Sequence, residues 1–110
     1  MKHRGQVRIV LVTCGHVAEA RRIARAVVEK RLAACVNIVL GSVESVYRWK
    51  DQVETARERL LIIKTTAARL AELEREVKRL HKYEVPEFLV LPVSGGSKEY
   101  LAWVATRPAH

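Results

Sequence analysis

The sequence has few cysteines and no long hydrophobic run, and each shortage excludes a class of protein. Two cysteines in 110 residues are too few for a disulfide scaffold, so we expect both thiols to be reduced. No window approaches the roughly 20 apolar residues that cross a membrane. The apolar run at residues 9–12 is too short for a signal peptide. We therefore expect a soluble, cytoplasmic protein with no membrane partner.

Catalytic signatures are also missing. No nucleophile stands at motif spacing from a base, and no glycine loop is suited to cradle a phosphate. The pair Gly95-Gly96 precedes a short helix, but a single turn of this kind is a weak anion signal. The sequence predicts a protein that binds rather than an enzyme.

Acidic residues are the minority among the charges, which leaves a net charge of +8. The excess is concentrated before residue 32, where Arg21, Arg22 and Arg25 fall on one side of an expected helix. Nucleic-acid binding would require interleaved aromatics or a recognition motif, and neither is present there. We interpret these arginines as a solvated basic face and expect no specific nucleic-acid partner.

Apolar residues make up 49% of the chain, which is enough for one compact core. Along the sequence they follow the period of a strand and that of a helix in turn. Strands are expected at 7–13, from Cys35 through a bulge at Gly41 to Trp49, at 53–64 and at 88–93. Asp51 is suited to the left-handed conformation of the turn between the middle two strands. Helices are expected at 16–31, after a cap at Thr66, and after a cap at Ser97.

The element order β-α-β-β-α-β with an added helix is that of an α+β, ferredoxin-like sandwich. We expect an antiparallel sheet of strand order 4-1-3-2, with the two main helices on one face. The other face and the long hairpin arms need a partner for burial. The chain is expected to form a single domain over residues 1–110, with flexible tails at 1–6 and 107–110.

Three short runs occur in fixed order and are unusual for a small domain. They are Arg31-Leu32-Ala33-Ala34-Cys35-Val36-Asn37, Ser45-Val46-Tyr47-Arg48-Trp49 and His81-Lys82-Tyr83-Glu84-Val85-Pro86-Glu87. Together they resemble the divalent-cation-tolerance (CutA) family, from about Val7 to Trp103. The resemblance implies a tightly packed homotrimer whose long strands pair between subunits, and we expect such an assembly to resist heat.

The expected topology decides how the two thiols are interpreted. Cys14 ends the first strand and Cys35 begins the second, at opposite ends of the sheet. A disulfide needs Cα atoms within about 7 Å, so none is expected between them. We predict that Cys35 is a buried core residue and that Cys14, at a strand end, is the more reactive thiol.

The same end of the sheet is expected to hold a metal site. Cys14 is followed by His16, and the second helix returns to this end with His81 at its C-terminus. Thiolate and imidazole suit copper or another divalent ion such as zinc. We predict Cys14, His16 and His81 as the ligands, whereas His3 and His110 lie on tails. The alternative is that Cys14 closes the core and His81 complements the helix dipole.

Aromatic residues suggest a second site. Tyr47 and Trp49 share a strand face, and Tyr100 and Trp103 lie on the last helix. Their leading interpretation is a subunit interface. Clefts between subunits could also gather Glu58, Lys64, Tyr83 and Glu87.

Two functions remain open on the sequence alone. The leading prediction is a cytoplasmic trimer of metal-ion homeostasis that binds copper or another divalent ion. The alternative is a PII-like regulatory trimer that senses a small anionic ligand at subunit clefts, by an analogy of fold alone.

Overall fold

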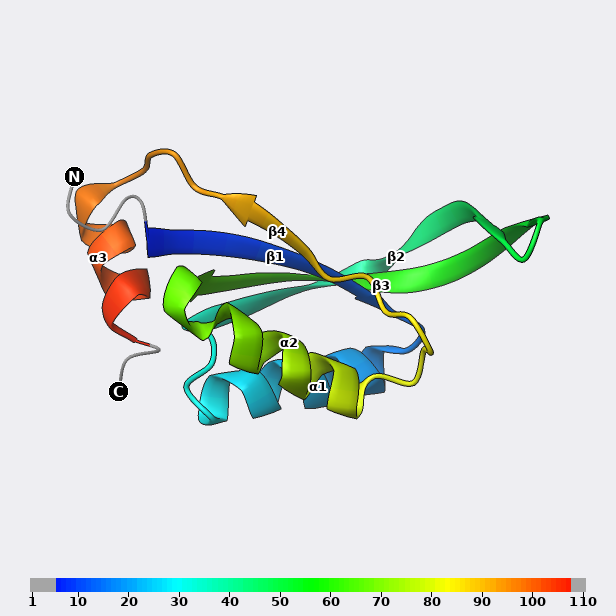
Figure 1. Cartoon of the computed structure of the whole chain (residues 1–110), viewed down its shortest axis with the longest axis horizontal. Helices are drawn as coiled ribbons and strands as arrows, with labels where there is room; N and C mark the ends of the chain where they lie inside the picture. Colours follow the sequence, from blue (N-terminus) through cyan, green and yellow to red (C-terminus); the bar gives the residue numbers. More distant parts are fainter. Residues whose placement is uncertain (1–5, 108–110) are drawn as a thin grey trace.

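The chain folds into a four-stranded antiparallel sheet with two helices packed against one face (Figure 1). The computed structural model describes residues 6–107. In chain order the elements are β1 (Val7–Cys14), α1 (Val17–Glu29), β2 (Cys35–Trp49), β3 (Gln52–Thr66), a 3-10 turn (Ala67–Arg69), α2 (Leu70–Leu80), β4 (Leu89–Pro92) and α3 (Lys98–Thr106). The strand order β2-β3-β1-β4 confirms the predicted ferredoxin-like α+β fold.

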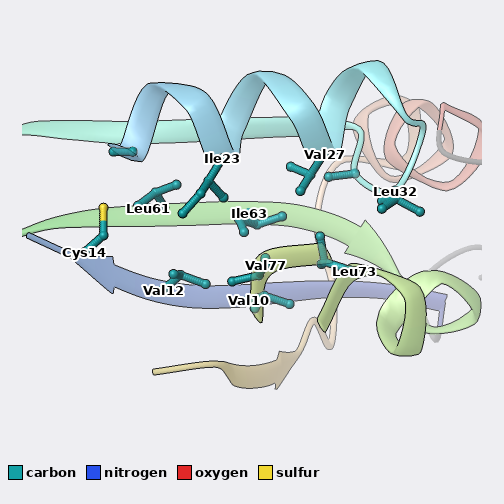
Figure 2. Packing of buried hydrophobic residues seen from close by; sticks show 12 residues of the cluster. Val10, Val12, Cys14, Ile23, Val27, Leu32, Leu61, Ile63, Leu73 and Val77 are labelled. Atoms are coloured by element: carbon teal, nitrogen blue, oxygen red, sulfur yellow. The ribbon is translucent and has the colours of Figure 1, made fainter. Parts of the chain in front are cut away.

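The core lies between the sheet and the two main helices. Strand alternation sends Val10 and Val12 of β1, and Leu61 and Ile63 of β3, toward the helices. Figure 2 shows them facing Ile23 and other apolar residues of α1 and α2, with Cys14 at the end of the row on β1. A smaller cluster holds α3 against the start of β1 through Val7, Leu101 and Val104.

The opposite face of the sheet is apolar and is not covered by α1 or α2 (Figure 1). The register places Ile62 beside Leu11, and Leu11 beside Leu89 of the edge strand β4. Leu89 and Leu91 are exposed, while Ile62 and Leu11 are only partly buried. We name this surface the open face, defined by Ile9, Leu11, Leu60, Ile62, Leu89 and Leu91. It confirms the prediction that the two main helices cover only one face of the sheet.

Strands β2 and β3 continue past the helices as a two-stranded arm (Figure 1). The molecule is therefore elongated, with extents of 45 × 25 × 25 Å. An irregularity between Val39 and Val43 confirms the predicted bulge around Gly41. At the tip, Asp51 has φ 67° as expected, and Lys50 shares the left-handed conformation with φ 51°.

Of the two helix caps predicted from the sequence, the structure contains one. Ser97 caps α3 as predicted, because its hydroxyl accepts a hydrogen bond from the Tyr100 N–H at 3.2 Å. The predicted cap at Thr66 is wrong, since its side chain makes no cap hydrogen bond. Thr66 still pairs with Val7 in the sheet, so the chain turns through Ala67–Arg69 before α2 begins.

The basic face of α1 is exposed, as the sequence indicates. Arg21, Arg22 and Arg25 all lie at the surface. Arg22 donates a hydrogen bond to the Leu80 carbonyl of α2 at 3.4 Å, and Arg25 forms an ion pair with Glu29 of α1 at 3.7 Å. Both arginines therefore interact with residues of the two helices. None of the described helices is both long enough and apolar enough to span a bilayer.

The predicted flexible tails, together with His3 and His110, lie outside the described residues except for Gln6 and Arg107. The Arg107 N–H donates to the Trp103 carbonyl at 3.2 Å, and its guanidinium lies 5.6 Å from the Trp103 ring centroid. Arg107 therefore continues the last turn of α3.

Candidate functional site

Cys14 is buried at the helix-facing side of β1, in line with Val10 and Val12 (Figure 2). Its thiol donates a long hydrogen bond to the His16 carbonyl at 3.7 Å. Burial, assisted by the nearby Glu19 carboxylate, raises the pKa of the Cys14 thiol to about 11. At neutral pH the group is therefore a protonated core thiol.

Both ring nitrogens of His81, the residue that ends α2, are engaged by neighbouring groups. Nε2 donates to the Thr13 carbonyl at 2.6 Å, and Nδ1 accepts from the Tyr83 N–H at 3.1 Å. Because a carbonyl can only accept and an amide N–H can only donate, the ring hydrogen resides on Nε2. The buried Glu19 carboxylate lies 3.5 Å from Nδ1 and accepts the Lys82 N–H at 2.9 Å.

The structure thus places Cys14 and His81 at one end of the sheet, as the topology predicts, because His81 bonds the residue just before Cys14. His16 is the N-cap residue of α1, with an exposed side chain that makes no cap hydrogen bond. Within residues 6–107, no three His, Cys, Asp or Glu side chains are grouped to hold a metal ion. The metal site at Cys14, His16 and His81 stays a prediction.

The predicted order of thiol exposure is wrong. Cys14 has no exposed surface, whereas Cys35 is partly exposed, and both thiols are free. The reason is strand alternation: Cys14 shares the core side with Val12, whereas Cys35 starts β2 on the side away from α1 and α2. The Lys64 ammonium lies 4.0 Å from the Cys35 sulfur on that side.

We accordingly expect Cys35 to react with a small alkylating reagent much faster than Cys14 in the native protein. Burial blocks access to Cys14, and its raised pKa removes the reactive thiolate. Timed alkylation followed by peptide mass spectrometry measures both rates, and unfolding in denaturant should make them similar. Faster native labelling of Cys14 would contradict the placement of β1.

A cleft of about 580 Å³ opens where the arm leaves the body of the protein. In Figure 1 the segment between α2 and β4 turns at this same end of the sheet. The arm contributes a hydroxyl and two aromatic rings, the segment contributes Tyr83 and its neighbours, and the strands β1 and β3 form the floor. The cleft is lined by Thr13, Ser45, Val46, Tyr47, Trp49, Glu58, Tyr83, Glu84, Val85 and Glu87.

The cleft is acidic although the protein is basic. Glu58 is only 7% exposed. Burial, followed by the interaction with the Glu58 carboxylate, raises the pKa of the Tyr83 phenol. Burial and the Glu58 charge raise the pKa of Glu87, against the opposing effect of a hydrogen bond with Thr13. Such a lining repels a small anion, so the anion-sensing alternative finds no support in this cleft.

The sequence anticipated part of this arrangement. Glu58, Tyr83 and Glu87 line one cleft within the chain, whereas Lys64 lies at the other end of β3, beside Cys35 and Asn37. Their convergence with Lys64 at clefts between subunits stays a prediction. Glu19 was missed as a partner of His81. Its signal was available, because Glu19 precedes Ile23 by four residues and so falls on the buried stripe of α1.

Comparison with known proteins assigns the chain to a family. Residues 8–107 match the model of the CutA1 divalent ion tolerance protein. The divalent-cation tolerance protein CutA of Thermus thermophilus is 49% identical over 96 residues, which cover 87% of this chain and 92% of that protein. The mouse protein CutA is 46% identical over 100 residues, 91% of this chain and 56% of the relative. The chain thus spans about half the length of the mouse relative, and likewise of the rice chloroplastic relative, where it covers 54%.

Solved structures agree with this assignment. The structure of the divalent cation tolerance protein of Thermus thermophilus superposes with a TM-score of 0.89 at 46% identity, over 92% of this chain and 97% of that one. That of the periplasmic divalent cation tolerance protein CutA of Archaeoglobus fulgidus gives 0.88 at 36% identity, over 93% and 98%. The fold is therefore the ferredoxin-like α+β fold of these proteins. The chain belongs to the CutA1 divalent ion tolerance protein family.

Proposed function

We propose that this chain acts in metal-ion homeostasis in the cytoplasm, as a homotrimer that binds copper or another divalent ion without a catalytic step. The ion is held by Cys14 and His81, with His16 as the third ligand. One observation carries this proposal. The His81 ring bonds the Thr13 carbonyl at 2.6 Å, which sets an imidazole beside the strand end that bears the Cys14 thiol. Free thiols are also the form expected in a reducing compartment.

Metal uptake at this position requires local rearrangement. The Cys14 thiol must lose its proton from a pKa of about 11, and His81 must release the Tyr83 N–H from Nδ1 or the Thr13 carbonyl from Nε2. The His16 side chain is exposed and makes no cap hydrogen bond, so no such bond has to break before it binds the ion. The proposal therefore implies modest affinity that increases with pH, because deprotonation of the thiol becomes easier.

We expect Cys14→Ser and His81→Ala each to weaken copper binding by more than about tenfold, or about 1.4 kcal/mol. Cys35→Ser is the matched control, because it removes the other thiol and should bind as the parent does. Isothermal titration between about pH 6 and pH 9 should show affinity that rises with pH in the parent and the control. Circular dichroism confirms that each variant is folded.

Parent-like copper affinity in both Cys14→Ser and His81→Ala would overturn the ligand assignment. An equal loss in Cys35→Ser would transfer the site to the Lys64 end of β3 and would likewise contradict it.

The trimer is supported by the distribution of apolar surface. The open face carries a continuous apolar row through Ile62, Leu11 and Leu89, and edge strand β4 is exposed along its length. The arm adds Val46 and Val53, each 65% exposed. Monomeric proteins rarely leave contiguous apolar surface of this extent in water. Association of copies would bury the open face and pair the strand edges, and the resulting continuous core accounts for the proposed heat resistance.

A further inference from the structure

The outer surface of α1 and α2 is basic and takes no part in the proposed metal site or in the proposed trimer. Figure 1 shows the two helices side by side on one face of the sheet. The trimer is proposed to bury the open face, on the other side of the sheet, so this surface remains accessible after assembly. We name it the helix-layer surface, defined by the exposed residues Arg21, Arg22, Arg25, Lys30, Arg75, Lys78 and Arg79.

The carboxylates of the two helices do not neutralise this surface. Those at the surface already have partners: Glu29 pairs with Arg25 at 3.7 Å, Glu72 with Arg69 at 3.0 Å and Glu74 with Lys78 at 2.8 Å. Arg21 and Arg75 form no ion pair with any residue of the range 6–107. Positive charge therefore remains in excess on the helix-layer surface.

Glu76 shows how this surface binds a carboxylate. Nε and Nη2 of Arg79 donate to its two oxygens at 3.1 and 2.8 Å, and the Lys30 ammonium donates to it at 2.9 Å. The matching forks of a guanidinium and a carboxylate give such a contact both strength and direction. Arg21 and Arg75 present the same group without a partner, one on each helix, so each can hold a carboxylate from outside the chain.

The dimensions of the surface indicate an extended partner rather than a small anion. The 13 residues of α1 give a length of about 20 Å, at about 1.5 Å per residue. The basic side chains are spread along this length on two helices. Several negative charges of one elongated ligand are therefore needed to engage them together.

The side chains of the two helices favour a protein segment over other polyanions. Neither α1 nor α2 contains an aromatic ring on which a nucleobase could stack. Val28, 40% exposed, is the only large apolar side chain exposed on these helices, so little could insert into a bilayer. Glu29, Glu72 and Glu74 would repel a continuous row of phosphates but leave room for carboxylates at separate positions.

We propose that the helix-layer surface docks an acidic segment of a partner protein, whose Asp or Glu carboxylates pair with Arg21 of α1 and Arg75 of α2. This docking site is separate from the proposed metal ligands and from the proposed subunit interface, and it depends on neither.

The 110-residue chain is titrated into a dye-labelled peptide of about eight glutamates, about 26 Å long when extended, and fluorescence anisotropy is measured. We expect a dissociation constant below about 100 μM at about 50 mM salt, which increases at least about tenfold in Arg21→Gln/Arg75→Gln. Lys50→Gln/Lys98→Gln is the matched control, because it removes the same charge from exposed positions outside the helix layer. It should bind within about twofold of the parent. Circular dichroism and sedimentation verify that both variants keep the parent's fold and assembly state.

Equal losses in the two double variants would overturn the proposal, because the peptide would then respond to net charge alone. Absence of peptide binding up to about 1 mM would also overturn it. A single-stranded oligonucleotide of about eight nucleotides and phosphatidylserine vesicles test the phosphate alternatives. Tighter binding of either than of the peptide, lost in Arg21→Gln/Arg75→Gln, would contradict a protein partner. A neutral glutamine-serine peptide of the same length should not bind, and its binding as tightly as the acidic peptide would contradict recognition by charge.

Discussion

Replacement of Ile63 by alanine is expected to lower the free energy of unfolding by about 2–5 kcal/mol. Ile63 lies in the middle of β3, has no exposed surface and belongs to the core between the sheet and the helices (Figure 2). Its neighbours across β1 and β2 are Val10 and Val36, which are fixed by the sheet register and cannot close the cavity. Urea unfolding at a fixed protein concentration measures the loss.

Ile62→Ala is the matched comparison, because it removes the same atoms one residue away on the opposite side of the strand. Ile62 is only partly buried within one chain. If the chain were a monomer, Ile62→Ala would cost clearly less than Ile63→Ala. In the proposed trimer its cost rises, and the unfolding midpoint depends on protein concentration. A loss below about 1 kcal/mol for Ile63→Ala would contradict the core described here.

The fold followed from the sequence because its signals act over short distances. The 3.6-residue period of Ile23 and Val27, and the apolar β-branched runs around Val10 and Ile63, require only local geometry and burial. The turn at Asp51 and the cap at Ser97 are likewise decided by one side chain and its own backbone. Thr66 failed as a cap because a tertiary pairing with Val7 keeps it in the sheet.

The candidate site followed less completely because it depends on which face each side chain occupies. The topology correctly brought His81 to the end of β1. It left burial of Cys14 in the core as the alternative, and the leading prediction was wrong because it took a strand end as exposed. A shift of one residue in the alternation of side chains exchanges the two faces of a strand. The bulge in β2 interrupts this alternation, so the sequence does not show which face each residue of the arm occupies. The burial of Glu58 depends on the segment 83–87, which lies beside it in the cleft. No periodicity in the sequence predicts the course of that segment.

The other large effect concerns the open face. Ile62→Glu is expected to dissociate the proposed trimer and raise its dissociation constant by at least about 100-fold, or about 2.7 kcal/mol. Ile62 lies between Asn37 and Leu11 in the register, at the middle of this face, so a carboxylate there would be buried without a partner on association. Val28→Glu is the control, because Val28 is an exposed residue of α1 on the helix layer and lies away from the open face.

Sedimentation equilibrium distinguishes the outcomes. The parent and Val28→Glu should have about three times the 12.5 kDa mass of one chain, and Ile62→Glu should approach the mass of a single chain at micromolar concentration. Dilution of the parent should leave it trimeric far below the concentration at which the variant separates. A parent of 12.5 kDa would refute the trimer. A trimeric Ile62→Glu would show that the copies associate through the arm and β4 without burying the centre of the open face.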